Sequence, residues 1–123
     1  MWEIILLEPV EDWFLRLCRD DPASADRVMD GLDHLAAEGP SLGRPMVDRI
    51  HGSVLHNLKE LRPGSSGASE IRMLFVFDAE RRAIILVAGD KSGRWAQWYT
   101  RNVPLAELRY GQYTDSRKLE DEG

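Results

Sequence analysis

The chain has 123 residues, of which 43% are hydrophobic and 30% are charged, and its formal net charge is −5. This length and composition predict one folded domain with a buried core, not a disordered segment. No apolar run approaches the roughly 18 residues of a membrane-spanning helix, and no basic segment precedes the apolar N-terminus as in a signal peptide. The single cysteine, Cys18, excludes an internal disulfide. We therefore expect a cytoplasmic protein.

The acidic charge is unevenly distributed along the chain. Residues 1–48 hold four basic and eleven acidic side chains, which gives −7, whereas residues 49–101 hold nine basic and five acidic ones, which gives +4. An acidic protein binds free nucleic acid weakly, but the local potential at a groove decides what binds there. The middle of the chain can therefore carry an anion site within an acidic protein.

The first part of the chain predicts a strand and two helices. Residues 2–7 are apolar and predict the strand. Pro9 opens a first amphipathic helix, and Pro22 opens a second one that ends at Gly39. Residues 39–53 contain three glycines and two prolines, which predicts a loop.

Three strands are predicted next, at residues 54–62, 70–77 and 83–89. A loop rich in glycine and serine at 63–69 and a short polar turn at 78–82 join them, so the strands form an antiparallel meander.

The middle strand has two different faces, because side chains alternate along a strand. Ile71 and Phe75 share one face with the other odd-numbered apolar residues, and we expect the two helices to cover it. Arg72 lies on the other face with Leu74 and Val76, and we expect that face to be open.

The C-terminal part predicts one helical turn at residues 94–99, a short helix opened by Pro104, and a polar, frayed tail at 114–123. The predicted fold is α+β with a single domain at residues 1–113. It comprises an N-terminal strand, a two-helix hairpin, a three-stranded antiparallel meander and a short C-terminal helix.

Three cations mark the ends of the predicted strands. Arg62 ends the first strand, Arg72 opens the second and Lys91 follows the third. In a meander these ends reach the same edge of the sheet, and arginine can bind phosphate oxygens through two bonds, so the cluster predicts a phosphate site. The structural alternative is that Arg62 pairs with Glu60 or Glu70 and that Lys91 is an ordinary exposed lysine of a loop.

The sequence around these cations resembles the RelE/HigB superfamily of bacterial toxins, most closely its phage-derived HigB-like branch. The shared motifs are Glu60-Leu61-Arg62, then Arg72-Met73-Leu74-Phe75, then a turn of the form Gly-x-Lys that ends at Lys91. The resemblance spans residues 2 to about 113 and implies a RelE-like fold. It also implies a ribosome-dependent messenger-RNA endoribonuclease, an mRNA interferase, with a cognate antitoxin of the helix-turn-helix type. Its RNA partner would be the messenger on the ribosome.

The resemblance implies catalytic roles for the three cations. Metal-free cleavage of RNA proceeds by attack of the 2′-hydroxyl on the adjacent phosphate, and Arg62 and Arg72 would stabilise the charge that develops on the phosphate oxygens. Lys91 would stabilise or protonate the leaving oxygen. Glu60 is the first candidate for the general base.

Two alternatives for the base remain, Lys59 and His56. Charged and aromatic side chains near the cations could hold or stack on unpaired RNA. The side chains expected to do so are Lys59, Arg94, Trp95 and Tyr99.

Other chemistries are not supported by the sequence. One cysteine and three scattered histidines give no metal-ligand spacing, and no glycine-rich nucleotide motif occurs, so we expect neither a metal nor a small-molecule cofactor. Related toxins often carry a catalytic histidine or tyrosine near the C-terminus, and this chain has no late histidine. Two rival hypotheses follow: a non-catalytic module of the same fold that binds a regulator or RNA, and an unrelated α+β protein with a different strand order.

Overall fold

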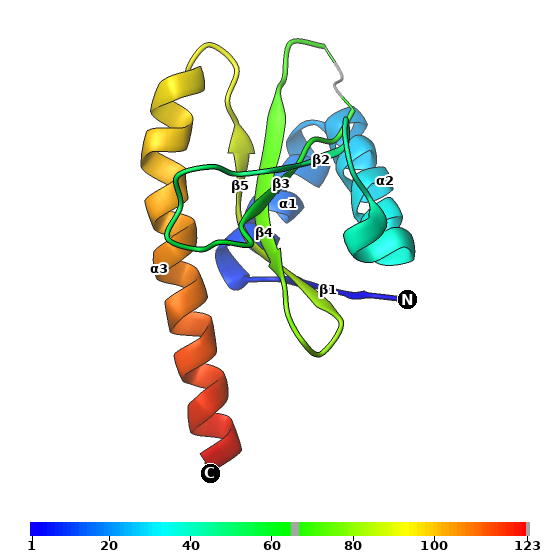
Figure 1. The fold of residues 1–123 in the computed structure, drawn as a ribbon. Coiled ribbons are helices and arrows are strands. Elements are labelled where there is room, and N and C mark those ends of the chain that lie inside the picture. The colour runs from blue at the N-terminus through cyan, green and yellow to red at the C-terminus, as the bar shows by residue number, and fades with distance from the viewer. Residues whose placement is uncertain (65–66, 123) are drawn as a thin grey trace.

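A computed structural model describes residues 1–64 and 67–122 (Figure 1). Two serines of the predicted 63–69 loop, Ser65 and Ser66, and the last residue of the predicted tail, Gly123, lie outside the described residues. The elements in chain order are β1 (Glu3–Leu6), α1 (Glu8–Asp20), α2 (Pro22–Glu38), a short 3-10 helix η1 (Gly39–Ser41), β2 (Val47–Arg49), β3 (Lys59–Leu61), β4 (Ile71–Phe77), β5 (Arg82–Asp90) and α3 (Trp95–Glu122).

In the described part of the chain, five strands form one mixed sheet in the order β1-β5-β4-β3-β2. β1 runs parallel to β5. The other three pairs, β5 with β4, β4 with β3 and β3 with β2, are antiparallel. The predicted α+β class and the antiparallel meander are therefore confirmed. The register between β4 and β5 shifts at Leu74 and Phe75, which marks a bulge in the centre of the sheet.

Helices α1 and α2 pack on one face of the sheet, as predicted. The N-terminus of α2 is capped by Asp21, whose carboxylate accepts hydrogen bonds from the backbone N–H of Ser24 at 3.3 Å and from its hydroxyl at 2.6 Å. The apolar stripe of α2 meets the odd-numbered side chains of β4. The buried residues of this core are Val10, Val28, Leu32, Leu35, Val47, Leu61, Ile71, Met73, Phe75, Ala83 and Ile85.

The other face of the sheet is covered by α3, so the expectation that this face is open was wrong. Leu74 and Val76 have no exposed surface and pack with Trp98 and Ala106 of α3. Figure 1 shows α3 along this side of the sheet, opposite α1 and α2, with its last turns extending beyond the strands.

The C-terminal helix is longer than the sequence predicted. Proline inside a helix removes a hydrogen bond and costs about 3 kcal/mol, so Pro104 predicted a helix start. In the structure Pro104 lies inside one helix that begins at Trp95 and continues to Glu122, through the stretch predicted to be a frayed tail. The packing of Trp98 before Pro104 and of Ala106 after it on the same sheet face explains why the helix continues. No helix within residues 1–64 and 67–122 is both long and apolar enough to cross a membrane.

Strand β2 was missed, because it lies within the predicted loop 39–53, and β3 is shorter than the predicted strand at 54–62. Both are three-residue strands, too short to show an alternating pattern. They exist because they pair with each other, Val47 opposite Leu61 and Arg49 opposite Lys59. This ribbon forms the edge of the sheet.

Candidate functional site

Glu60 is the centre of a charged cluster at the end of the sheet covered by the first turns of α3. It lies on β3, on the face that α3 covers, and only 2% of its surface is exposed. One carboxylate oxygen accepts a hydrogen bond from Arg62 Nε at 2.8 Å, and the other accepts one from the hydroxyl of Tyr99 at 2.5 Å. A buried carboxylate is tolerated here because both oxygens are hydrogen-bonded.

Arg62 lies between two carboxylates. Besides Glu60, its Nη2 donates to Asp48 Oδ2 on β2 at 3.2 Å, and the other oxygen of Asp48 accepts from Arg44 Nε at 3.2 Å. Burial lowers the pKa of Arg62, but its hydrogen bond to Glu60 and the charges of both carboxylates outweigh burial and leave the pKa raised. The guanidinium is therefore charged and held in one orientation.

Lys91 is buried, so the alternative of an ordinary exposed lysine was wrong. It is 3% exposed, and its Nζ lies 3.4 Å from the hydroxyl of Tyr99 and 3.5 Å from the ring centroid of Trp95. Burial, followed by repulsion from Arg72, lowers its pKa. Its ammonium therefore gives up a proton more readily than a lysine in water does.

Tyr99 connects the two charged halves of the cluster. Its hydroxyl donates to Glu60 and accepts from Lys91. Burial and the hydrogen bond to Glu60 raise its pKa well above the usual value for tyrosine, so this hydroxyl keeps its proton. The resulting chain of contacts runs from Lys91 through Tyr99 and Glu60 to Arg62.

Arg72 comes from β4 and lies on the same face of the sheet as Glu60, since Leu74, two residues further on, is the cross-strand partner of Glu60. Its Nη1 donates to the carbonyl of Ile71 at 2.8 Å. Its Nε is buried and has no hydrogen-bond partner within the described part of the chain. Such an unpaired donor is uncommon in folded proteins and is often found where a ligand or water binds.

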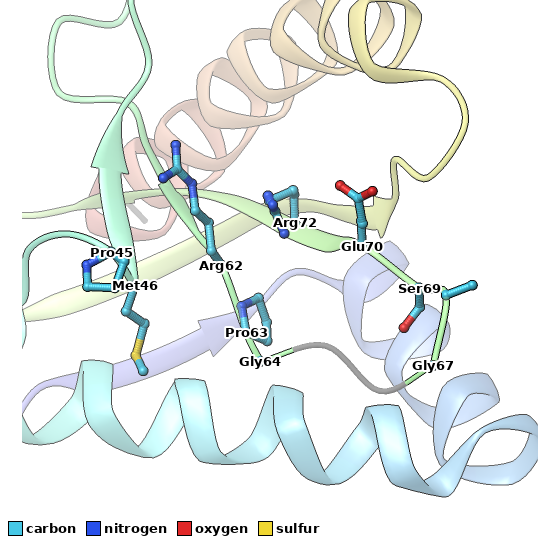
Figure 2. Close-up of a pocket in the computed structure, with 10 residues that line it drawn as sticks. Pro45, Met46, Arg62, Pro63, Gly64, Gly67, Ser69, Glu70 and Arg72 are labelled. Carbon is cyan, nitrogen blue, oxygen red and sulfur yellow. The ribbon is translucent and has the colours of Figure 1, made fainter.

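Arg62 and Arg72 line one pocket, which we call the Arg62 pocket. It has a volume of about 700 Å³, and Figure 2 shows both arginines extending from the strands beside it. Its described lining residues are Pro45, Met46, Arg62, Pro63, Gly64, Gly67, Ala68, Ser69, Glu70 and Arg72.

The structure thus brings the four predicted catalytic residues together, although not as expected. Glu60 is buried and engaged by two donors, and the predicted structural pairing of Arg62 with Glu60 is also present. The sequence reasoning missed Asp48, which holds the other side of Arg62. No sequence signal identified it, because the three residues of β2 show no pattern of their own.

The four predicted RNA contacts are separated in space. Trp95, 59% exposed, and Tyr99 lie one helical turn apart over Lys91. Lys59 lies on the opposite face of the sheet from Glu60, with its Nζ 5.4 Å from the ring of Phe77. Arg94 lines a separate hollow beside Trp98 and Arg101. Trp95 and Tyr99 are therefore part of the cluster, and the other two residues lie outside it.

A metal cluster is not formed by the described residues: no three His, Cys, Asp or Glu side chains among them are arranged to hold a metal ion.

Comparisons with known proteins identify the relatives of this chain. Residues 13–111 match the family described as "Phage derived protein Gp49-like". The chain is 50% identical over 106 residues to "Putative toxin HigB3" of Mycobacterium tuberculosis. The matched region covers 86% of this chain and 88% of that protein. It is 43% identical over 107 residues to "Putative toxin HigB2" of the same organism, covering 87% of this chain but only about half, 52%, of that protein. The α+β fold is RelE-like. The chain therefore belongs to the phage-derived Gp49-like family, in the HigB-like branch of the RelE/HigB toxins.

Proposed function

We propose that this HigB-like toxin is a ribosome-dependent endoribonuclease that cleaves messenger RNA by metal-free attack of a 2′-hydroxyl on the adjacent phosphate. The observation that carries the proposal is the grouping of Arg62 and Arg72 along one pocket, with Lys91 linked to Arg62 through Tyr99 and Glu60. Positive charge held in place where negative charge develops is usually the largest contribution to catalysis.

The two arginines would bind the scissile phosphate. The described contacts of Arg62 use its Nε–H and one N–H of Nη2, out of five N–H donors on a guanidinium, so further donors remain for phosphate oxygens. Arg72 has a buried Nε without a partner among the described residues. Glu60 and Asp48 orient Arg62 before substrate binds, so less ordering is needed during the reaction.

Two proton transfers complete the reaction. The 2′-hydroxyl loses its proton as its oxygen bonds to phosphorus, and the 5′-oxygen gains one as its bond to phosphorus breaks, which leaves a cyclic phosphate and a 5′-hydroxyl. We assign Lys91 to the leaving oxygen, because its lowered pKa favours proton donation.

Of the three candidates for the base, Glu60 lies beside the arginines and keeps unused lone pairs after accepting its two hydrogen bonds. Lys59 and His56 line a different hollow.

The ribosome and an antitoxin are the proposed partners. A chain with a net charge of −5 attracts free RNA weakly, and a ribosome would supply the messenger to the local cations. The similar proteins are named as toxins, which supports a cognate antitoxin, and we propose one of the helix-turn-helix type. We expect it to cover the basic surface around the Arg62 pocket or the acidic outer surface of α1 and α2.

The test is primer extension on a reporter messenger after brief induction of the chain in bacteria. Wild type should produce new 5′ ends within codons. Arg62→Ala and Arg72→Ala should each reduce them about 10²–10³-fold, the effect of losing one such donor. Arg16→Ala, on the exposed surface of α1, is the matched control and should cleave as wild type does. Equal cleavage by all four proteins would contradict the proposed site.

A non-catalytic binding module is the second candidate, because two observations favour it. Arg62 is already paired with two carboxylates, and Lys91 is buried beneath Trp95. A module of this kind would leave the reporter uncut while the chain is soluble and expressed, and it would still bind its partner.

A further inference from the structure

The edge ribbon of β2 and β3 carries two pairs of like charges, one on each face. Asp48 and Glu60 are cross-strand partners, and so are Arg49 and Lys59. Like charges directly opposite each other on a sheet are destabilising unless an opposite charge lies between them. Each pair therefore needs a counter-charge.

The acidic pair has its counter-charge within the chain. Arg62 binds Asp48 and Glu60 at the same time. The basic pair has none among the described residues. Arg49 donates to the backbone carbonyl of His56 at 3.1 Å, and the ammonium of Lys59 faces the ring of Phe77.

The basic pair lines a groove of about 480 Å³, which we call the β2 groove. Arg44, His56 and Asn57 also line it. Asp48 is the acidic residue in this lining, and both of its oxygens already accept hydrogen bonds, from Arg44 and Arg62. The groove is therefore strongly cationic on a chain whose net charge is −5.

We propose that the β2 groove binds the backbone phosphates of a single RNA strand, next to the phosphate held in the Arg62 pocket. This inference rests on the proposed function for the identity of the substrate. Its ligand chemistry is a run of phosphodiesters, and Arg49 and Lys59 are the residues that bind it.

The two hollows are neighbours, which favours one continuous strand as the ligand. Pro45 and Met46 line the Arg62 pocket, whereas Arg44 and Asp48, on either side of them in sequence, line the β2 groove. Asp48 also connects the hollows directly, because it binds Arg62 with one oxygen and Arg44 with the other. A strand carries a phosphate at every nucleotide, so it can occupy both sites at once.

The experiment measures binding of a fluorescent ten-nucleotide 2′-O-methyl RNA, which lacks the attacking hydroxyl and cannot be cleaved. Fluorescence anisotropy is recorded between about 50 and 200 mM salt, the range over which phosphate contacts weaken measurably. We expect Arg49→Gln and Lys59→Gln each to weaken binding several-fold at low salt. Each should also reduce the slope of log affinity against log salt by about 0.7, the value for one phosphate contact to a single strand.

Two controls identify the cause of any loss. Arg16→Gln removes the same charge from the exposed surface of α1 and should leave affinity and slope unchanged. Lys59→Arg keeps the positive charge and should retain wild-type binding, so a failure to fold is distinguished from a lost contact.

The inference is overturned if wild type does not bind the RNA, or if Arg49→Gln and Lys59→Gln behave as Arg16→Gln does. It is also overturned if a ten-residue polyglutamate peptide displaces the RNA at equal concentration, because the groove would then be a site for acidic peptides. Cleavage in cells that depends on Arg62, without any effect of the groove variants on binding, would leave the proposed function intact. RNA binding that depends on Arg49 and Lys59, without cleavage in cells, would support the groove and contradict the proposed function.

Discussion

Each face of the β2–β3 ribbon carries a pair of like charges, but the two pairs differ in whether the protein supplies a counter-charge. On the face toward α3, the buried Glu60 and the partly exposed Asp48 share Arg62 as their counter-charge. On the other face, Arg49 and Lys59 have no ion pair among the described residues. The first face is therefore preorganised by the protein itself, whereas the second leaves its positive charge available to the anionic ligand that we propose.

Glu60→Ala should have the largest effect on this comparison. It leaves the hydroxyl of Tyr99 and Nε of Arg62 without the carboxylate that accepts their hydrogen bonds. Breaking a buried charge pair costs about 3–5 kcal/mol, and the partial exposure of Arg62 places our expectation near the lower end. Urea denaturation measures the free energy of unfolding. A loss below about 1 kcal/mol would show that Glu60 does not hold the cluster together.

Gly89→Ala should have the next largest effect on stability. It tests how closely α3 must approach the sheet. A Cβ at Gly89 would lie 2.9 Å from Nε1 of Trp98. The ring and the first turns of α3 would have to shift, and overpacking of this kind typically costs about 1–3 kcal/mol. Thermal unfolding measures the loss. Gly43→Ala, where a Cβ meets nothing within 4 Å, is the matched control and should change stability little.

Lys59→Glu should increase stability, whereas the two changes above reduce it. It places a carboxylate opposite Arg49 in place of a second cation, which should stabilise the chain by about 0.2–1 kcal/mol. The same change should weaken RNA binding more than Lys59→Gln does. Urea denaturation and anisotropy on the same sample measure both effects. A destabilised variant would show that the basic pair carries no electrostatic cost.

The smallest expected effect is a pH dependence that arises from Lys91. Its pKa is lowered in the folded chain, so the unfolded chain binds more protons, and stability should rise with pH from the lowered pKa toward the usual value of 10.5. Lys91→Met removes this contribution. Between about pH 8 and pH 9.5, below the usual pKa of tyrosine, the free energy of unfolding of wild type should therefore rise relative to that of the variant. Parallel stability curves over this range would contradict the assigned burial of the ammonium.

Local patterns in the sequence were sufficient for the central elements. Periodic apolar residues and proline start signals predicted α1 and α2, and the apolar runs at 70–77 and 83–89 predicted β4 and β5, with Ile71 and Arg72 on opposite faces. These elements carry their own signal because each is long enough to show the period of its face. The cations at the strand ends were also visible, because short motifs placed them relative to the strands.

The tertiary structure decided the features that depend on contacts between distant residues. β2 has three residues and exists only through its pairing with β3, so Asp48 could not be assigned as a partner of Arg62. α3 continues through Pro104 because side chains on both sides of the proline pack on the sheet. The sequence by itself determined which charges the protein carries and placed Arg62, Arg72 and Lys91 at the ends of strands. Only the assembled sheet and α3 decided which of them are buried and paired, because burial and pairing depend on residues that are far apart in the chain.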